Sequence, residues 1–164
     1  MNEFKLFVIS DSHFGHKNMV ENGTIGLREA GYDDKIWAGL DSLPDDAILI
    51  HCGDITMGAD MATHERLRKY PFKKWLIRGN HDGHSITWYV RNGWDFVGDE
   101  LVLNILGSRI LFTHAPTPKR EGITKNIHGH LHGGKSRSRP SFYEDGYHVE
   151  VCPEVIGYMP AKLK

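Results

Sequence analysis

The sequence carries almost no net charge and very little cysteine. Its 164 residues hold 20 Lys and Arg against 21 Asp and Glu, which leaves a net charge of −1. A chain so balanced has no overall electrostatic attraction to nucleic acid or to a membrane surface. Its two cysteines, Cys52 and Cys152, lie far apart in the sequence and fit neither a disulfide framework nor a zinc motif. We therefore expect two reduced thiols in a cytoplasmic protein.

Long hydrophobic runs are missing as well. The N-terminal apolar run, Leu6–Ile9, ends at Ser10, whereas a bilayer-spanning helix needs about 20 apolar residues and a signal peptide needs a longer stretch than this. We expect no membrane association. With 40% hydrophobic and 25% charged residues, and only 18 Gly and 7 Pro, the composition excludes a disordered or collagen-like chain. The length favours a single domain that spans residues 1–164.

Histidine, in contrast, is abundant and unevenly placed. Most of the 11 histidines stand in short groups: His13 with His16, His81 with His84, and His128 with His130 and His132. Imidazole is the commonest metal ligand among side chains, so grouped histidines near Asp and Gly indicate metal binding. Outside these groups we expect His51 in the core and His64 at the surface.

The order of apolar and amphipathic segments predicts an α/β sandwich. Short apolar runs predict strands, at 4–9, 47–50, 74–77, 100–106, 109–113, 126–128 and 148–152. Segments with helical spacing of apolar residues predict helices, at 33–40, 60–70 and 86–92. Strands and helices alternate in the first half, as in βαβ units, and Gly107–Ser108 predicts a hairpin in the second half.

Polar clusters with a neighbouring glycine follow five of the predicted strands. Ligands of α/β proteins bind at the carboxyl ends of the strands, so we expect these clusters to meet at one rim. Together they supply two carboxylates, one amide and four imidazoles: Asp11, His13, Asp54, Asn80, His114, His130 and His132. This set is too large for one ion and suits two. Because it contains no thiolate, it favours divalent Mn, Fe, Zn or Co over a structural zinc site, and the residual positive charge suits a phosphate dianion.

The same clusters form an ordered set of motifs. They are Asp11-x-His13, Gly53-Asp54, Gly79-Asn80-His81-Asp82, His114 and Gly129-His130-x-His132. In this order they resemble the calcineurin-like metallophosphoesterases, and the opening Asp11-Ser12-His13-Phe14-Gly15-His16-Lys17-Asn18 resembles the small bacterial and phage branch of that superfamily. The resemblance covers residues 11–132 and implies a two-sheet αββα sandwich.

The resemblance also implies a reaction. One metal would take Asp11, His13 and His132, the other would take Asn80, His114 and His130, and both would share Asp54. Manganese is the first expectation, with iron, zinc, cobalt or nickel as alternatives. A hydroxide bridging the two metals would attack phosphorus in line, and His81 would protonate the leaving oxygen or stabilise the charge developing there. Phosphomonoesters and phosphodiesters both stay open, with a phosphorylated small molecule or a nucleotide as the substrate.

Two other functions remain open. Residues 114–139 carry six basic side chains and one acidic, and such a block forms either an anion-steering rim for a nucleic-acid end or only a solvated loop. Phe142 and Tyr143 beside it could stack a base. A catalytically silent interaction scaffold on the same fold is the other alternative, although the chain keeps the ligands and the histidine expected of an enzyme. His16 and Asn18 fit substrate contact and the start of a surface helix equally well.

Overall fold

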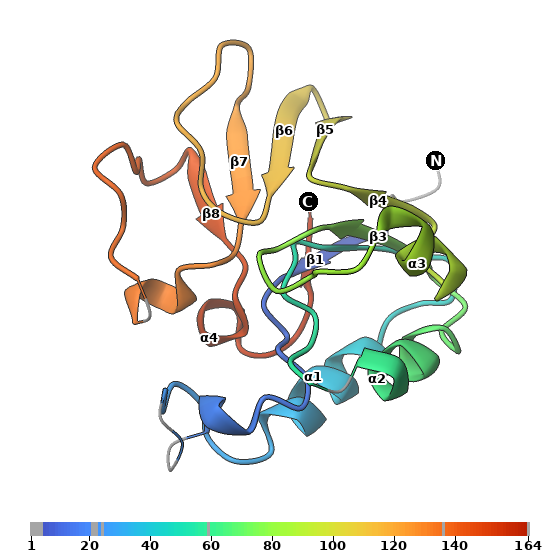
Figure 1. Cartoon of the computed structure of the whole chain (residues 1–164). Helices are drawn as coiled ribbons and strands as arrows, with labels where there is room; N and C mark the ends of the chain where they lie inside the picture. The colour runs from blue at the N-terminus through green and yellow to red at the C-terminus, as the bar shows by residue number, and fades with distance from the viewer. Residues whose placement is uncertain (1–4, 21–22, 24, 59, 136, 164) are drawn as a thin grey trace.

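Two β-sheets packed face to face organise the chain (Figure 1). The structure is a computed structural model that describes residues 5–20, 23, 25–58, 60–135 and 137–163. The first sheet contains β1 (Leu6–Ile9), β2 (Ile48–His51), β3 (Lys73–Ile77), β4 (Phe96–Gly98) and β9 (Ala161–Lys162). The second contains β5 (Glu100–Ile105), β6 (Ser108–Thr113), β7 (Lys125–His128) and β8 (His148–Glu150). The helices are α1 (Tyr32–Asp41), α2 (Asp60–Leu67), α3 (Ile86–Arg91) and α4 (Pro153–Ile156), with 3₁₀ turns at Lys17–Met19 and His132–Gly134.

Strand direction determines where the loops meet. The first sheet has the order β4-β3-β2-β1-β9, in which β1 to β4 are parallel and β9 is antiparallel. The second has the order β5-β6-β7-β8, in which β6 to β8 are parallel. The predicted hairpin joins β5 to β6 through Leu106 and Gly107, whose φ values of 49° and 81° are those of a two-residue hairpin turn. Parallel strands within each sheet therefore end at a common edge.

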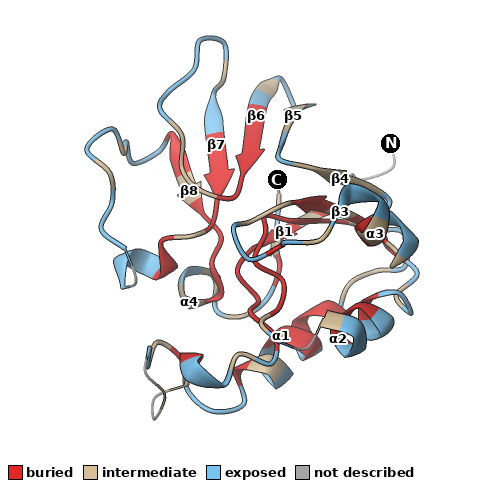
Figure 2. Cartoon of the chain, viewed as in Figure 1, coloured by how far each residue is buried: buried red, intermediate tan, exposed pale blue. Residues whose placement is uncertain are grey.

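Two hydrophobic cores lie on the two faces of the first sheet. Val8, Ile50 and Ile77 face the second sheet, where Phe112 and Ile127 pack against them. The alternate residues of the same strands face α1, α2 and α3, and contribute Ile9, Leu49 and Leu76 to the other core. Buried residues accordingly fill β1, β6 and β7 and the inner face of α1 (Figure 2). Burial of each such side chain stabilises the fold by about 1.5–3 kcal/mol.

Loop residues cover the outer face of the second sheet. The Tyr143 ring stacks on His148, with centroids 4.5 Å apart, and also meets His128 edge to face. The backbone N–H of Thr117 donates to Oδ1 of buried Asn126 at 3.0 Å. The αββα arrangement predicts a helical layer here, and within the described residues the side chains that pack on this face belong to loops. The segment that covers this face also carries the basic residues noted in the sequence.

Most predicted elements are present, and the α/β class with two packed sheets is confirmed. The expectation for residue 4 lies outside the described residues. Three short elements, β4, β9 and α4, were not predicted. His64 was predicted at the surface and is buried, because it accepts the Trp94 indole N–H at 3.1 Å and packs against the ring of Trp88.

Among the described residues, no helix has the length and apolar character needed to cross a membrane.

Candidate metal centre

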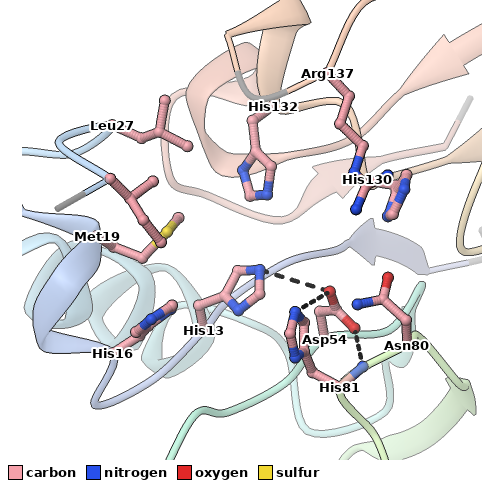
Figure 3. A pocket seen from close by; sticks show the side chains of 11 residues that line it. His13, His16, Met19, Leu27, Asp54, Asn80, His81, His130, His132 and Arg137 are labelled. Carbon is pink, nitrogen blue, oxygen red and sulfur yellow. Dashed lines mark hydrogen bonds and ion pairs between the residues drawn. The ribbon is translucent and has the colours of Figure 1, made fainter.

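The structure brings the seven predicted ligands together at the strand ends. Asp11 and His13 follow β1, Asp54 follows β2, and Asn80 follows β3. From the second sheet, His114 follows β6, and His130 and His132 follow β7. Because parallel strands end at one edge, both sheets deliver their polar loops to the same rim. Five of the seven, all but Asp11 and His114, line a pocket of about 100 Å³ together with His16, His81 and Arg137 (Figure 3).

Five of these seven residues have a left-handed backbone. Asp11, His13, Asp54, His130 and His132 all have positive φ, between 46° and 74°. This conformation is uncommon for residues other than glycine, and it is concentrated at functional sites where the surrounding structure holds it in place. The strands thus stop in sharp turns that aim these side chains inward.

Two glycines let the carboxylates approach the neighbouring loops. A Cβ atom at Gly79 would collide with Oδ1 of Asp54, and one at Gly129 would collide with Oδ2 of Asp11. Neither loop could therefore close around its carboxylate with any larger residue. This explains the glycine that precedes each of the Asn-His and His-x-His motifs.

Asp11, His13 and His132 form one half of the centre, and its innermost oxygen has no hydrogen-bond partner. Oδ2 of Asp11 accepts the His130 backbone N–H at 2.9 Å and the Cys152 thiol at 3.3 Å. Oδ1 is buried without a partner and lies 3.5 Å from His132 Nε2 and 3.7 Å from His13 Nε2. Burial acts to raise the pKa of Asp11, but the neighbouring imidazoles of His13, His114 and His132 outweigh it and lower that pKa well below its usual range. Asp11 is therefore held as a carboxylate.

A buried ion pair supports His132 from behind. His132 Nδ1 donates to Oε1 of Glu154 at 3.1 Å, which orients the ring so that Nε2 faces Oδ1 of Asp11. The same oxygen accepts from Nε of Arg28 at 2.6 Å, and the Arg28 guanidinium also donates to the main-chain oxygens of Asp11 and Ser12. Burial acts to raise the pKa of Glu154, but His132 and Arg28 outweigh it and hold that pKa at about 2. One arginine thus fixes both the carboxylate and the Asp11 turn.

Asn80, His114 and His130 form the other half. His114 Nδ1 donates to the Cys52 carbonyl at 2.9 Å, so Nε2 is the acceptor nitrogen. That Nε2 lies 3.0 Å from Asn80 Oδ1 and 3.0 Å from His130 Nδ1. Burial, together with the nearby His114 ring and the Arg137 guanidinium, lowers the pKa of His130, which favours its neutral, metal-binding form. Asn80 is exposed and His130 is half-buried, so this half opens toward solvent.

Asp54 lies between the two halves. Its Oδ2 is 3.7 Å from His13 Nε2 and 3.4 Å from His114 Nε2, and its Oδ1 accepts the backbone N–H of His81 at 2.9 Å. Behind it, the buried carboxylate of Asp82 accepts the backbone N–H groups of Asp54 and Gly79, both at 2.8 Å. This joins the loop after β2 to the loop after β3. The position of Asp54 is that expected of a ligand shared by two ions.

The donor set fits two divalent cations. In one half, Oδ1 of Asp11 is buried without a hydrogen-bond partner, and in the other, His114 Nε2 lies 3.0 Å from both Asn80 Oδ1 and His130 Nδ1. A cation would stabilise both arrangements. Three-residue groups with ligand atoms within 4.8 Å of one another are Asp11–His13–Asp54, Asp54–His114–His130 and Asp11–His132–Cys152. Only the last includes a sulfur atom, and Cys152 was not predicted to lie here. That these residues bind metal remains a prediction.

Comparison with known families identifies the fold. A model of the calcineurin-like phosphoesterase superfamily domain matches residues 4–142. The chain belongs to this superfamily. No curated protein shows significant sequence similarity to it.

Solved structures show the same calcineurin-like phosphoesterase fold. A protein of unknown function from Aquifex aeolicus aligns with a TM-score of 0.72 and 22% identity, over 96% of this chain and 94% of that one. An archaeal phosphodiesterase aligns with a TM-score of 0.54 and 18% identity, over 90% and 82%. The Pseudomonas putida nuclease MPE aligns with a TM-score of 0.53 and 22% identity, over 78% of this chain and 62% of that one. At these identities the likeness concerns the fold alone.

Two residues that support this site were not found from the sequence. Arg28 and Glu154 belong to none of the motifs and stand 126 positions apart, so no local pattern connects them. His81 and His16, in contrast, were singled out, and both line the pocket.

Proposed function

We propose that the protein hydrolyses a phosphoester with two divalent cations bound at this centre, manganese first among them. The observation that carries the proposal is Asp54, whose Oδ2 lies within 3.7 Å of an imidazole from each half. A shared carboxylate of this kind is what a two-metal phosphatase or phosphodiesterase requires. Membership of the phosphoesterase superfamily supports the same reaction class.

When bound, the cations would neutralise phosphate charge and lower the pKa of a water molecule at the site. The remaining roles fall to side chains of the chain. His81, whose side chain is 40% exposed, stands 3.9 Å from Asp54 at the mouth of the pocket, where the leaving oxygen would depart. As an imidazolium it would donate its Nε2 proton to that oxygen. Its backbone N–H holds Asp54, so one residue couples the leaving-group side to the shared ligand.

Two features favour an enzyme over a silent scaffold. The pocket that contains the ligands is open at His81, which gives a phosphate group access. Arg137 lines the same pocket beside His130, where a guanidinium would pair with phosphate oxygens (Figure 3). We propose a phosphorylated small molecule or nucleotide as the substrate. The cytoplasm is the compartment we propose, because Cys52 and Cys152 are free thiols.

The test is hydrolysis of bis-p-nitrophenyl phosphate and p-nitrophenyl phosphate by metal-stripped protein with Mn²⁺ added back. We expect turnover that depends on Mn²⁺ and is lost in Asp54→Asn. His81→Ala should lower kcat about 10²–10⁴-fold on an ester with a poor leaving group, and less on p-nitrophenyl esters, whose leaving oxygen needs little protonation. Absence of turnover with Mn²⁺, Fe²⁺, Co²⁺, Ni²⁺ and Zn²⁺, in protein that binds two ions, would overturn the proposal and leave the scaffold.

A further inference from the structure

A second groove adjoins the metal pocket and has a different character. It is lined by Ala115, Pro116, Leu131, Pro140 and Phe142, with His130 and Arg137 shared with the metal pocket. Its volume is about 420 Å³, within the range of about 300–1,000 Å³ that is typical of small-molecule sites. The metal pocket is smaller, at about 100 Å³. Because the two cavities share His130 and Arg137, a substrate whose phosphate lies in the metal pocket can extend into this groove.

The walls of the groove suit a flat ring. Phe142 is 38% exposed, and proline and aliphatic side chains line the groove with it. An exposed phenylalanine beside two prolines offers a rigid face on which an aromatic ring can stack. Its ring lies 6.0 Å from that of His148, which is in turn stacked on Tyr143, so the platform is supported from behind.

The charge at the junction suits a phosphate. Of the basic residues in 114–139, Lys119, Arg120 and Arg139 are each paired with a carboxylate, at 2.9–3.0 Å. Within the described part of the chain, no carboxylate pairs with Arg137. Arg137 lines both cavities, so its guanidinium is free to contact a phosphate that spans them. Of the described basic residues in 114–139, Arg137 is therefore the one placed to bind phosphate here, and the block does not form the continuous anion-steering rim considered from the sequence.

We infer that this groove, the Phe142 groove, binds the nucleoside of a nucleoside phosphodiester whose phosphate lies at the metal centre. The inference rests on the proposed function and specifies its substrate class. Arg137 would hold the phosphate, and Phe142 would stack on the base. A mononucleotide ester and the end of a nucleic-acid strand share this chemistry.

Two esters with the same leaving group test the inference. Thymidine 5′-(4-nitrophenyl phosphate) and methyl 4-nitrophenyl phosphate differ only in the group that the groove would hold. We expect the thymidine ester to have a kcat/KM about tenfold or more above that of the methyl ester, as for the loss or gain of one base stack. Phe142→Ala should bring the ratio close to one, and Phe142→Trp should restore it. Leu106→Ala, at the exposed hairpin tip, is the matched control and should keep the wild-type ratio.

The outcomes separate this inference from the proposed function. If wild-type protein hydrolyses both esters with equal kcat/KM, and Phe142→Ala does not change this ratio, the groove does not bind the nucleoside. The proposed phosphoester hydrolysis would be unaffected by that result. If neither ester is hydrolysed, nucleoside binding in the groove is tested by calorimetry of Mn²⁺-loaded protein with thymidine 5′-monophosphate and with methyl phosphate. Tighter binding of the nucleotide that is lost in Phe142→Ala supports nucleoside binding in the groove. Equal affinity for the two ligands overturns it. If a ten-residue oligothymidylate binds more tightly than the mononucleotide, and its affinity depends strongly on salt, the nucleoside that the groove binds belongs to the end of a nucleic-acid strand.

Discussion

The two halves of the metal centre are built differently. The half formed by Asp11, His13 and His132 is buried, and the Arg28–Glu154 ion pair holds His132 from behind, with side chains 0% and 2% exposed. In the half formed by Asn80, His114 and His130, only His114 is buried, and its support is a main-chain carbonyl. The buried half is held by a side-chain ion pair, whereas the open half reaches both cavities through His130. We therefore expect the first ion to bind tightly and the second to exchange more readily.

The shared carboxylate gives the largest expected effect. Asp54→Asn removes the negative charge that both halves use, so binding of the second ion should fail and hydrolysis should fall by about a thousandfold or more. Hydrolysis of bis-p-nitrophenyl phosphate and metal content per chain measure the two effects. Asp46→Asn, which changes an exposed carboxylate paired with Lys5, is the control. If Asp54→Asn keeps two ions and full activity, Asp54 is not shared.

The buried half is tested at Glu154. Glu154→Gln removes the charge that faces both His132 and Arg28, so the tighter ion should bind about 10–100-fold more weakly. The uncompensated Arg28 charge should also cost about 3–5 kcal/mol in the free energy of unfolding. Metal titration and urea denaturation measure these effects, with Glu144→Gln, an exposed partner of Lys119, as the matched control. Weakening of only the second ion would contradict the assignment of the buried half.

The open half is tested at Asn80. Asn80→Ala removes a neutral ligand from an exposed position, so the second ion should bind about tenfold more weakly while the first is unaffected. The free energy of unfolding should change by no more than about 0.5 kcal/mol, because the side chain is exposed. Asn104→Ala, on the exposed side of β5, is the control. A large loss of stability would show that this half is as firmly integrated as the other.

Two buried histidines outside the metal centre, His51 and His64, should make the stability of the protein depend on pH. Burial lowers the pKa of His51 to about 3 and of His64 to about 4. In the unfolded chain histidine takes up a proton near pH 6.5, so between about pH 6.5 and 4 the unfolded state binds more protons than the folded state. The free energy of unfolding should therefore decrease as the pH falls through this window, by at most about 1.4 kcal/mol per pH unit for each histidine.

His64→Asn isolates one of these contributions. The substitution keeps an acceptor for the Trp94 indole N–H and removes the titrating ring. Urea denaturation at pH 6.5, 5.5 and 4.5 should show a shallower pH dependence than in wild type. Leu106→Ala should keep the wild-type slope. If the slope of His64→Asn matches that of wild type as well, His64 does not contribute to acid sensitivity.

The sequence predicts the positions of the candidate ligands better than it predicts what supports them. Apolar strands that end in Asp, Asn or His place these side chains at strand ends, and parallel strands bring such ends together. The roles of Arg28 and Glu154 could not be predicted in this way, because their ion pair forms only when the segment after β8 folds back onto the loop after β1. His64 was misplaced because the Trp88 and Trp94 rings that bury it arrive from later in the chain. β4 and β9 are only three and two residues long, too short to show an apolar period.

The most direct test of the central claim follows bound manganese and hydrolysis in the same sample. Metal-stripped protein is titrated with Mn²⁺, and at each step the bound ions per chain and the rate of bis-p-nitrophenyl phosphate hydrolysis are measured. Two ions of unequal affinity, with turnover that rises only as the second binds, are the predicted result. Full turnover with one ion bound, or turnover in protein that holds none, would contradict a shared two-metal centre at Asp54.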